Sequence, residues 1–257
     1  MPSNNFGRRR FLGRVLATSG SLLLAGCDRL SQTEWFPQVL SSAEKLTQAA
    51  QKLIVPRNAM AQEFSAADIS PEFRSNGTSN PNNPLYQALA VDGFRDYQLK
   101  ISGLVEHPAV YSLAELKALP SRSQITRHDC VEGWSAIGKW QGVQLSQLLQ
   151  RAQPKAGARY AVFYCADPMD ARGTTYYYES IDLDEANHPQ TLLAYALNDA
   201  DLPIKNGAPI RLRVERQLGY KMAKYVMEIK LVDSFTDIAG GKGGYWEDRG
   251  YEWFAGI

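Results

Sequence analysis

Cys130 is the residue of this sequence whose type and setting most clearly allow chemistry. It ends a segment, residues 123–130, in which apolar and polar residues alternate, and Glu132, a glycine and Trp134 follow it. A thiolate is a soft ligand for transition metals, and a metal bound to it protects the sulfur from oxidation. We therefore predict that Cys130 binds a metal at the end of a strand, beside a polar loop.

A disulfide is the main alternative for this cysteine. Cys165 is the only other cysteine after the N-terminal region, and two thiols in an oxidising compartment ordinarily pair. Both cysteines end predicted strands beside polar loops, and a core of this size does not need a bridge to be stable. The metal interpretation is favoured, and the disulfide stays the alternative.

Two basic residues flank a glycine turn further along the chain. Arg211 follows the segment 206–209, and Lys224 comes five residues after Gly219. Positive side chains and the N–H groups of loops together bind phosphate. A solvated charged face would be the simpler interpretation if this segment stood alone, but other motifs accompany it.

Several familiar sites do not occur in the sequence. The three histidines, His107, His128 and His188, are too scattered to form a zinc site by spacing. No Ser-His-Asp pattern with a nucleophile elbow is present, and the glycine run 240–244 lacks the second half of a P-loop. No Cys-x-x-Cys-His motif for covalent haem occurs.

The motifs that remain resemble those of the sulfite oxidase superfamily of molybdopterin-dependent oxidoreductases. The segment 130–135, with Trp140 and Gly142 after it, is similar to the molybdenum-cysteine segment of that superfamily. Three later segments resemble its other signatures: 184–189, 206–211 and 219–225. The similarity extends over most of residues 70–235. It is closest to the periplasmic bacterial branch, which includes methionine sulfoxide reductases.

This resemblance implies a fold, a cofactor and a reaction. The expected fold class is α+β, a sulfite-oxidase-type molybdopterin-binding fold of mixed β-sheets with short helices. The expected cofactor is molybdenum with one molybdopterin, and Cys130 is the protein thiolate on the metal. The expected reaction is two-electron oxygen-atom transfer with a small S- or N-oxide type substrate, in which the metal performs the difficult step.

The resemblance also implies which residues hold the cofactor. We expect contacts from eight positions: Asn76, Tyr86, Cys165, Asn206, Arg211, Met222, Ala223 and Lys224. Within the N-terminal cofactor loop, Asn76 is favoured and Tyr86 is the second contact. Cys165 stands where the reductase branch has a threonine, so this chain departs from the pattern there.

Glu132 and Arg127 are the residues that we predict to surround the metal site and assist catalysis. Arg127 is chosen because no apolar residue lies on its face of the predicted strand. Glu132 serves equally well as a structural acid that accepts hydrogen bonds from backbone N–H groups. The sequence leaves both roles of Glu132 open.

The direction of the reaction is also open at this stage. A sulfite-oxidising site should gather several arginines around its anion, whereas a sulfoxide reductase pocket should be more neutral and aromatic. The aromatic clusters 176–178 and 245–254 favour the second, although core packing also explains them.

A membrane-tethered binding protein that kept the fold without catalysis is a further alternative. Because no fused haem domain is expected, an enzyme would need a separate redox partner, a cytochrome or a membrane haem protein.

The first 27 residues predict export and lipid attachment. Residues 8–12, Arg-Arg-Arg-Phe-Leu, resemble a twin-arginine signal, which sends folded proteins through the Tat export machinery. The apolar stretch 15–25 is too short to span a bilayer as a stable helix. Residues 24–27 resemble a lipobox, in which Cys27 is acylated; a simple cleaved signal or an uncleaved anchor is the alternative. We expect a protein anchored through Cys27 in the periplasm or at the outer face of the cytoplasmic membrane.

The rest of the chain must build the elements that position these residues. The 257 residues include 28 basic and 27 acidic ones, which gives no electrostatic case for a nucleic-acid partner. After the signal at 1–27 we expect a tether and helix over 28–64 and the molybdopterin-binding domain over 65–257. Alternation predicts strands at 97–101, 123–130, 159–165, 210–214 and 227–231. Helical spacing predicts short helices at 46–53, 112–120 and 145–152. Segment 192–197 is a strand or a buried helix, and 65–95 is expected to be a long loop.

Overall fold

The computed structural model describes residues 33, 46–47, 49–51, 56 and 58–257. It divides the chain into two compact units, 1–54 and 55–257. In the first unit the described residues 46–47 and 49–51 are helical, as predicted. The twin-arginine segment and Cys27 lie outside the described residues. Across the described part of the chain, no helix has the length and apolar character needed to cross a membrane.

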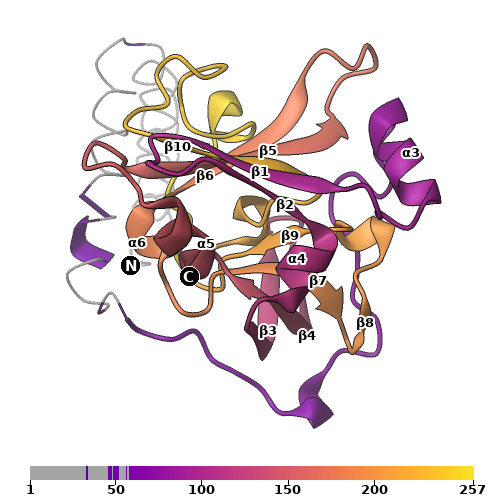
Figure 1. The fold of residues 1–257 in the computed structure, drawn as a ribbon. Helices are drawn as coiled ribbons and strands as arrows, with labels where there is room; N and C mark the ends of the chain where they lie inside the picture. The colour runs from indigo at the N-terminus through magenta and orange to yellow at the C-terminus, as the bar shows by residue number, and fades with distance from the viewer. Residues whose placement is uncertain (1–32, 34–45, 48, 52–55, 57) are drawn as a thin grey trace, which may run out of the picture. The chain divides into compact units, whose positions relative to one another are not determined.

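Two β-sheets form the second unit (Figure 1). The first has the strand order β2-β1-β10-β5-β6, and β1 runs parallel to β10 while its other pairs are antiparallel. Its strands are β1 (Gln98–Gly103), β2 (Ala109–Ser112), β5 (Tyr160–Pro168), β6 (Tyr176–Asp182) and β10 (Val226–Val232). The first sheet is therefore mixed.

The second sheet is antiparallel throughout. Its order is β3-β4-β7-β8, and β9 also pairs with β7. Its strands are β3 (Ser121–Cys130), β4 (Trp134–Gln144), β7 (Leu192–Leu197), β8 (Ala200–Asp201) and β9 (Arg211–Arg213). The sequence left 192–197 undecided. The structure makes it a strand, and all six of its residues are buried because strands flank it on both sides.

The helices of this unit are short, and none exceeds eight residues in the part that the structure describes. The α-helices are α3 (Pro84–Val91), α4 (Leu113–Ala118), α5 (Leu145–Ala152) and α6 (Leu183–Ala186). The 3-10 helices are η1 (Ala66–Asp68), η2 (Ile204–Asn206), η3 (Gly219–Lys221) and η4 (Glu247–Arg249). The predicted α+β class, with mixed sheets and short helices, is confirmed.

Both sheets contribute to one hydrophobic core. A single cluster of buried residues includes Leu99 and Phe163 of the first sheet together with Leu193 of the second. Val143 and α5 join the same cluster, because the predicted stripe of α5 buries Leu145, Leu148, Leu149 and Ala152. A shared core fixes the two sheets against each other, so residues from both can line one site.

Strand β4 was not predicted, because two glycines interrupt its pattern. A Cβ at Gly142 would lie 2.2 Å from the carbonyl oxygen of Leu193, so β4 passes β7 too closely for any side chain there. The register shifts between Gln141 and Gly142, as expected of a bulge marked by glycine. Strands β2 and β6 were also not predicted.

The predicted loop over 65–95 is wrong in part, because it contains α3. The side chain of Asn83 accepts hydrogen bonds from the N–H groups of Leu85 and Tyr86, and Pro84 occupies the first helical turn. An asparagine cap followed by proline is a typical start of a helix.

The compact unit also begins before the predicted boundary at residue 65. The N–H of Phe64 donates to the carbonyl oxygen of Ile125 at 2.8 Å, and Glu63 forms a β-bridge with Thr126. Residues just before 65 therefore add to the edge of the second sheet at β3.

Candidate active site

Cys130 is the last residue of β3 and opens into a cavity. The hairpin between β3 and β4 turns at Gly133, whose N–H donates to the carbonyl oxygen of Cys130 at 3.0 Å. Gly133 has φ +83°, a left-handed conformation that favours glycine. Alternation along β3 buries Cys130 on the same face as Thr126 and His128. The thiol is therefore held at a fixed strand end, with 8% of the residue exposed.

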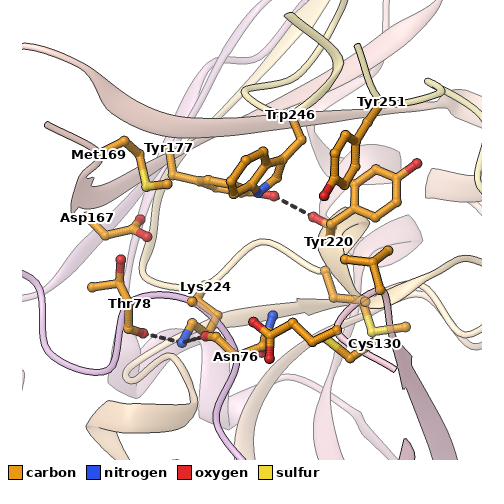
Figure 2. A pocket seen from close by; sticks show the side chains of 15 residues that line it. Asn76, Thr78, Cys130, Asp167, Met169, Tyr177, Tyr220, Lys224, Trp246 and Tyr251 are labelled. Atoms are coloured by element: carbon orange, nitrogen blue, oxygen red, sulfur yellow. Dashed lines mark hydrogen bonds between the residues drawn. The ribbon is translucent and has the colours of Figure 1, made fainter. Parts of the chain in front are cut away.

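The cavity has a volume of about 210 Å³ and two chemically different walls (Figure 2). Its polar wall includes Asn76, Thr78, Asp167 and Lys224. Its aromatic wall includes Tyr177, Tyr220, Trp246 and Tyr251. Residues of both sheets contribute, because Cys130 ends β3 while Asp167 and Tyr177 belong to β5 and β6.

Lys224 binds the loop 74–78 that forms the cavity floor. Its Nζ donates to the carbonyl oxygen of Asn76 at 2.6 Å, to that of Lys205 at 3.1 Å, and to that of Thr78. Burial, and then the nearby Arg211, lower the pKa of Lys224 to about 7. The dipoles of these carbonyl groups stabilise the charged form of Lys224. Among the described residues, no carboxylate accepts a hydrogen bond from its Nζ.

Arg211 lies behind the same loop and is completely buried. Its Nη2 donates to Oδ1 of Asn76 at 3.2 Å, and its Nη1 donates to the carbonyl oxygen of Asn206 at 3.2 Å. Its Nε has no partner in the described part of the chain. Burial, and then Arg213, lower the pKa of Arg211 to about 9. Arg211 in turn lowers the pKa of the buried Lys224, so an anion bound at this corner would favour the charged forms of both residues.

His128 precedes Cys130 by two residues on the same buried face of β3. Its ring is fully buried, with Nδ1 3.1 Å from Nη1 of Arg213 and 3.2 Å from Sδ of Met222. Burial, and then Arg211, lower the pKa of His128 well below its usual value. The imidazole is therefore neutral, and because Nδ1 accepts from Arg213 its proton lies on Nε2. A Cβ at Gly219 would lie 2.4 Å from this ring, so η3 packs directly on His128.

Asp167 is a site residue that the sequence analysis missed. It lines the cavity with only 4% of the residue exposed, and its Oδ1 has no partner among the described residues. Burial raises the pKa of Asp167 to about 6, although its own backbone N–H and Lys224 oppose the shift. The acid follows Cys165 by two residues on β5, and only the pairing of distant strands shows that it faces the cavity.

The structure brings three predicted cofactor residues to the cavity lining and a fourth directly behind it. Asn76, Met222 and Lys224 line it together with Cys130, and Arg211 lies immediately behind Asn76. Burial raises the pKa of the Cys130 thiol, while the N–H of Glu132 and the nearby Arg211 lower it. A free Cys130 is therefore a thiol at neutral pH, and metal binding would release its proton.

The other four predicted cofactor residues lie behind the lining. Tyr86 donates its hydroxyl to the carbonyl oxygen of Ala208 at 2.7 Å, and Nδ2 of Asn206 reaches the carbonyl oxygen of Arg74 at 3.5 Å. Ala223 is buried, and its carbonyl oxygen accepts from Leu212 at 2.8 Å. These residues fix the loops that carry the cavity residues.

Cys165 is buried within the core, and its thiol lies 4.0 Å from the carbonyl oxygen of Phe163. Both Cys165 and Cys130 are free, and they belong to different sheets. The disulfide alternative is therefore wrong for this structure.

Arg127 and Glu132, the predicted catalytic neighbours, have different positions. Arg127 alternates away from Cys130 along β3, its side chain is 55% exposed, and its Nε pairs with Asp129 at 3.0 Å. This placement does not support a role for Arg127 beside the metal. Glu132 does line the cavity, and its Oε2 accepts from the indole N–H of Trp134 at 2.9 Å. This hydrogen bond stabilises the turn between β3 and β4 at the edge of the cavity.

The residues fit a cofactor that brings a phosphate and further metal ligands. In the described part of the chain, the hydrogen bonds of Arg211 and Lys224 go to uncharged oxygens, and burial is the main cause that lowers their pKa values. In the described part of the chain, no group of three or more His, Cys, Asp and Glu residues is placed to hold a metal ion. A metal on Cys130 therefore needs ligands from a cofactor, and a dithiolene supplies soft sulfur of the same kind.

Comparisons with known proteins agree with this geometry. Residues 87–237 match the family described as "Oxidoreductase molybdopterin binding domain". A putative protein-methionine-sulfoxide reductase subunit YedZ1 of Azospira oryzae is 36% identical over 252 residues, which cover 97% of this chain and 87% of that protein.

Two further similarities are partial. The protein-methionine-sulfoxide reductase catalytic subunit MsrP of Xanthomonas campestris is 40% identical over 151 residues, covering 56% of this chain and 47% of that protein. The chain thus matches about half the length of this relative. The crystal structure of the sulfane dehydrogenase SoxCD from Paracoccus pantotrophus has a TM-score of 0.49 and 24% identity, covering 54% of this chain and 39% of that one.

Proposed function

The chain belongs to the oxidoreductase molybdopterin-binding domain family, and from this premise we propose that it reduces organic sulfoxides by two-electron oxygen-atom transfer. In the balanced reaction a sulfoxide takes up two electrons and two protons and yields a thioether and water. The sulfur–oxygen bond breaks, the sulfur is reduced, and the electrons come from a separate redox protein. The substrate class that we propose is methionine sulfoxide, after the names of the similar reductase subunits.

One observation carries this proposal: Cys130 opens into the same cavity as Lys224 and Asn76, with Arg211 behind them. A sulfur ligand and an anion-binding corner, contributed by segments distant in the sequence, are what a metal held by a phosphate-bearing cofactor requires. A structural cysteine would not need a buried lysine and a buried arginine beside it whose hydrogen bonds, within the described part of the chain, all go to uncharged oxygens.

The side chains of the cavity then have separate tasks. The Cys130 sulfur would bind molybdenum, and Arg211, Lys224 and the loop 74–78 would hold the cofactor's phosphate arm. The bound molybdenum–molybdopterin supplies the exchangeable oxo chemistry and the two-electron step. Asp167 can hold a proton at its carboxyl below a pH of about 6, and the aromatic wall limits the access of water.

The cavity favours a sulfoxide over sulfite as substrate. Among the described residues that line it, Lys224 is the only cation, whereas Glu132 and Asp167 are both acids. A sulfite ion would meet this acidic pair with no arginine on the lining, and it would face rings whose surfaces are negative. A neutral sulfoxide avoids both penalties. Sulfite oxidation is therefore the alternative that the substrate test must compare.

A Cys130→Ser variant tests the proposed function. We expect the wild type to contain about one molybdenum per chain and to oxidise reduced viologen dye when methionine sulfoxide is added. The variant should lose most of its molybdenum and this activity, because an alcohol is a poor ligand for a soft site. A Cys165→Ser variant is the matched control and should keep its molybdenum. A wild type that is active with sulfite but not with sulfoxides would overturn the proposal.

We further propose that the protein works outside the cytoplasm. The twin-arginine segment and Cys27 support export of the folded, loaded protein and its lipid anchoring at a membrane surface. The electron donor would be a cytochrome or a membrane haem protein, and the term "catalytic subunit" in the similar proteins' names supports such a partner.

Cell fractionation of a Cys27→Ala variant tests the anchor: the variant should leave the membrane fraction. Isolated membranes that fail to reduce the purified enzyme would contradict the membrane donor.

A further inference from the structure

The C-terminal segment, residues 240–257, is built firmly onto the rest of the unit. The N–H of Tyr245 donates to the carbonyl oxygen of Tyr178 at 2.9 Å, and the Tyr178 hydroxyl donates to Asp248 at 2.6 Å. The indole N–H of Trp253 donates to Oγ of Ser180 at 2.9 Å. These bonds tie the segment to β6, so its position does not depend on a bound ligand.

A buried charge cluster holds the middle of this segment. Nζ of Lys221 donates to Glu247 at 2.6 Å and to Glu179, and all three side chains are at most 1% exposed. A Cβ at Gly244 would lie 1.9 Å from Oε2 of Glu247, so the close approach of this buried carboxylate requires a glycine at that position. Lys221 thus joins η3 and β6 to the C-terminal segment at one point.

This anchoring presents two aromatic rings of the segment to the cavity (Figure 2). The rings of Trp246 and Tyr251 stack with centroids 5.3 Å apart, and the Tyr220 ring meets Tyr251 edge-on at 5.2 Å. The Tyr220 hydroxyl donates to the carbonyl oxygen of Glu252 at 2.6 Å, which fixes that ring too. The result is a preorganised aromatic surface across the cavity from the polar wall.

We propose that Trp246, Tyr251 and Tyr220 form a binding subsite for the side chain of methionine sulfoxide, including the methylene groups next to its sulfur. This inference rests on the proposed function and names the residues that set its specificity. It assigns recognition to the C-terminal segment, whereas the metal and its cofactor are held by β3 and the loops beside Arg211 and Lys224.

The chemistry of a sulfoxide matches this surface. Its sulfur carries partial positive charge, which the negative face of an aromatic ring attracts, and sulfur–aromatic contacts are favourable in proteins. The methyl and methylene groups of the side chain are apolar and lose contact with water against the same rings. Small S-oxides that lack the methylene chain gain less of this contact.

A Trp246→Ala variant, assayed with two substrates, tests the subsite. With N-acetyl methionine sulfoxide amide we expect KM to rise about ten-fold or more, with kcat changed far less, because the lost contact is made in both ground and transition states. With dimethyl sulfoxide the change in KM should be much smaller. Titration calorimetry of the oxidised enzyme, which cannot turn over without a reductant, should show the same loss of affinity for the methionine substrate.

Two controls separate the possible failures. Tyr176→Ala removes an aromatic residue of β6 that is 43% exposed and lies outside the cavity lining, and it should leave both substrates unaffected. The molybdenum content of Trp246→Ala must equal that of the wild type. If the wild type reduces both sulfoxides but Trp246→Ala weakens them equally or not at all, the subsite is wrong while the proposed function stands. If the wild type reduces neither, the proposed function itself fails.

Discussion

At the scale of single residues, the site is defined by two buried cations, Arg211 and Lys224, whose hydrogen bonds in the described part of the chain go to uncharged oxygens. Lys224 donates to three backbone carbonyl oxygens, yet burial and Arg211 lower its pKa to about 7. The group therefore costs stability while it is charged in the cofactor-free protein. An anionic cofactor would remove that cost, which couples folding of this corner to cofactor binding.

The pH dependence of stability follows from this lowered pKa. Between pH 7 and the usual lysine value of 10.5, the unfolded chain binds a proton at Lys224 that the folded, cofactor-free protein has partly lost. Stability contributed by this group should rise with pH across that window. Urea unfolding of cofactor-free protein at pH 7, 8 and 9 should show a steeper rise for the wild type than for Lys224→Met. Parallel curves for the two proteins would refute the explanation.

At the scale of secondary structure, the cavity depends on how η3 packs against β3. Gly219 opens η3 directly over the His128 ring, and the same segment brings Met222 to the cavity lining. Any side chain at Gly219 would push η3 away from the strand that ends in Cys130. The glycine is required here by close approach, since its φ angle is one that other residues adopt.

Gly219→Ala should therefore destabilise the protein by about 1–3 kcal/mol, as overpacking does in a filled interior. Gly157→Ala is the matched control, because a Cβ at that glycine would have no heavy atom within 4 Å. Denaturant unfolding of the two variants measures the difference. Equal stability of both variants would mean that η3 can shift without cost, contrary to the packing described.

At the scale of the whole unit, the cavity lies where residues of the two sheets come together. Cys130 ends a strand of the second sheet, whereas Asp167 and Tyr177 belong to the first. A cofactor bound there would contact both sheets and the loop 74–78 at once. Its binding energy would then add to the stability of the complete unit, since an unfolded chain offers no such site.

Removal of the cofactor should consequently lower the unfolding temperature of the whole unit in one step. Linkage predicts a loss of about 2.7 kcal/mol when cofactor is present at a hundred times its Kd, and more at higher occupancy. Calorimetry of protein purified with and without molybdopterin synthesis in the host would measure this. Identical unfolding temperatures for loaded and cofactor-free protein would contradict a site that bridges both sheets.

The sequence alone determined the features that local patterns encode. Alternation along residues 123–130 predicted β3 and the position of Cys130 at its end, because a strand places every second residue on one face. The capping pattern at Ser112 likewise predicted α4, in which Ser112 and Glu115 cap each other's N–H groups. The order of the motifs was enough to indicate the family and the cofactor-binding segments.

Only the tertiary structure decided which distant residues share the cavity. Asp167, Tyr177 and Trp246 reach it through strand pairing and long-range packing, which leave no periodic signal in the sequence. The partners of Lys221 could not be predicted from the sequence either. It stands within a motif of the cofactor-binding segment, yet it forms ion pairs with Glu179 and Glu247. Local sequence fixes the direction of a side chain relative to its own strand, whereas its neighbours depend on how separate elements pack around the shared core.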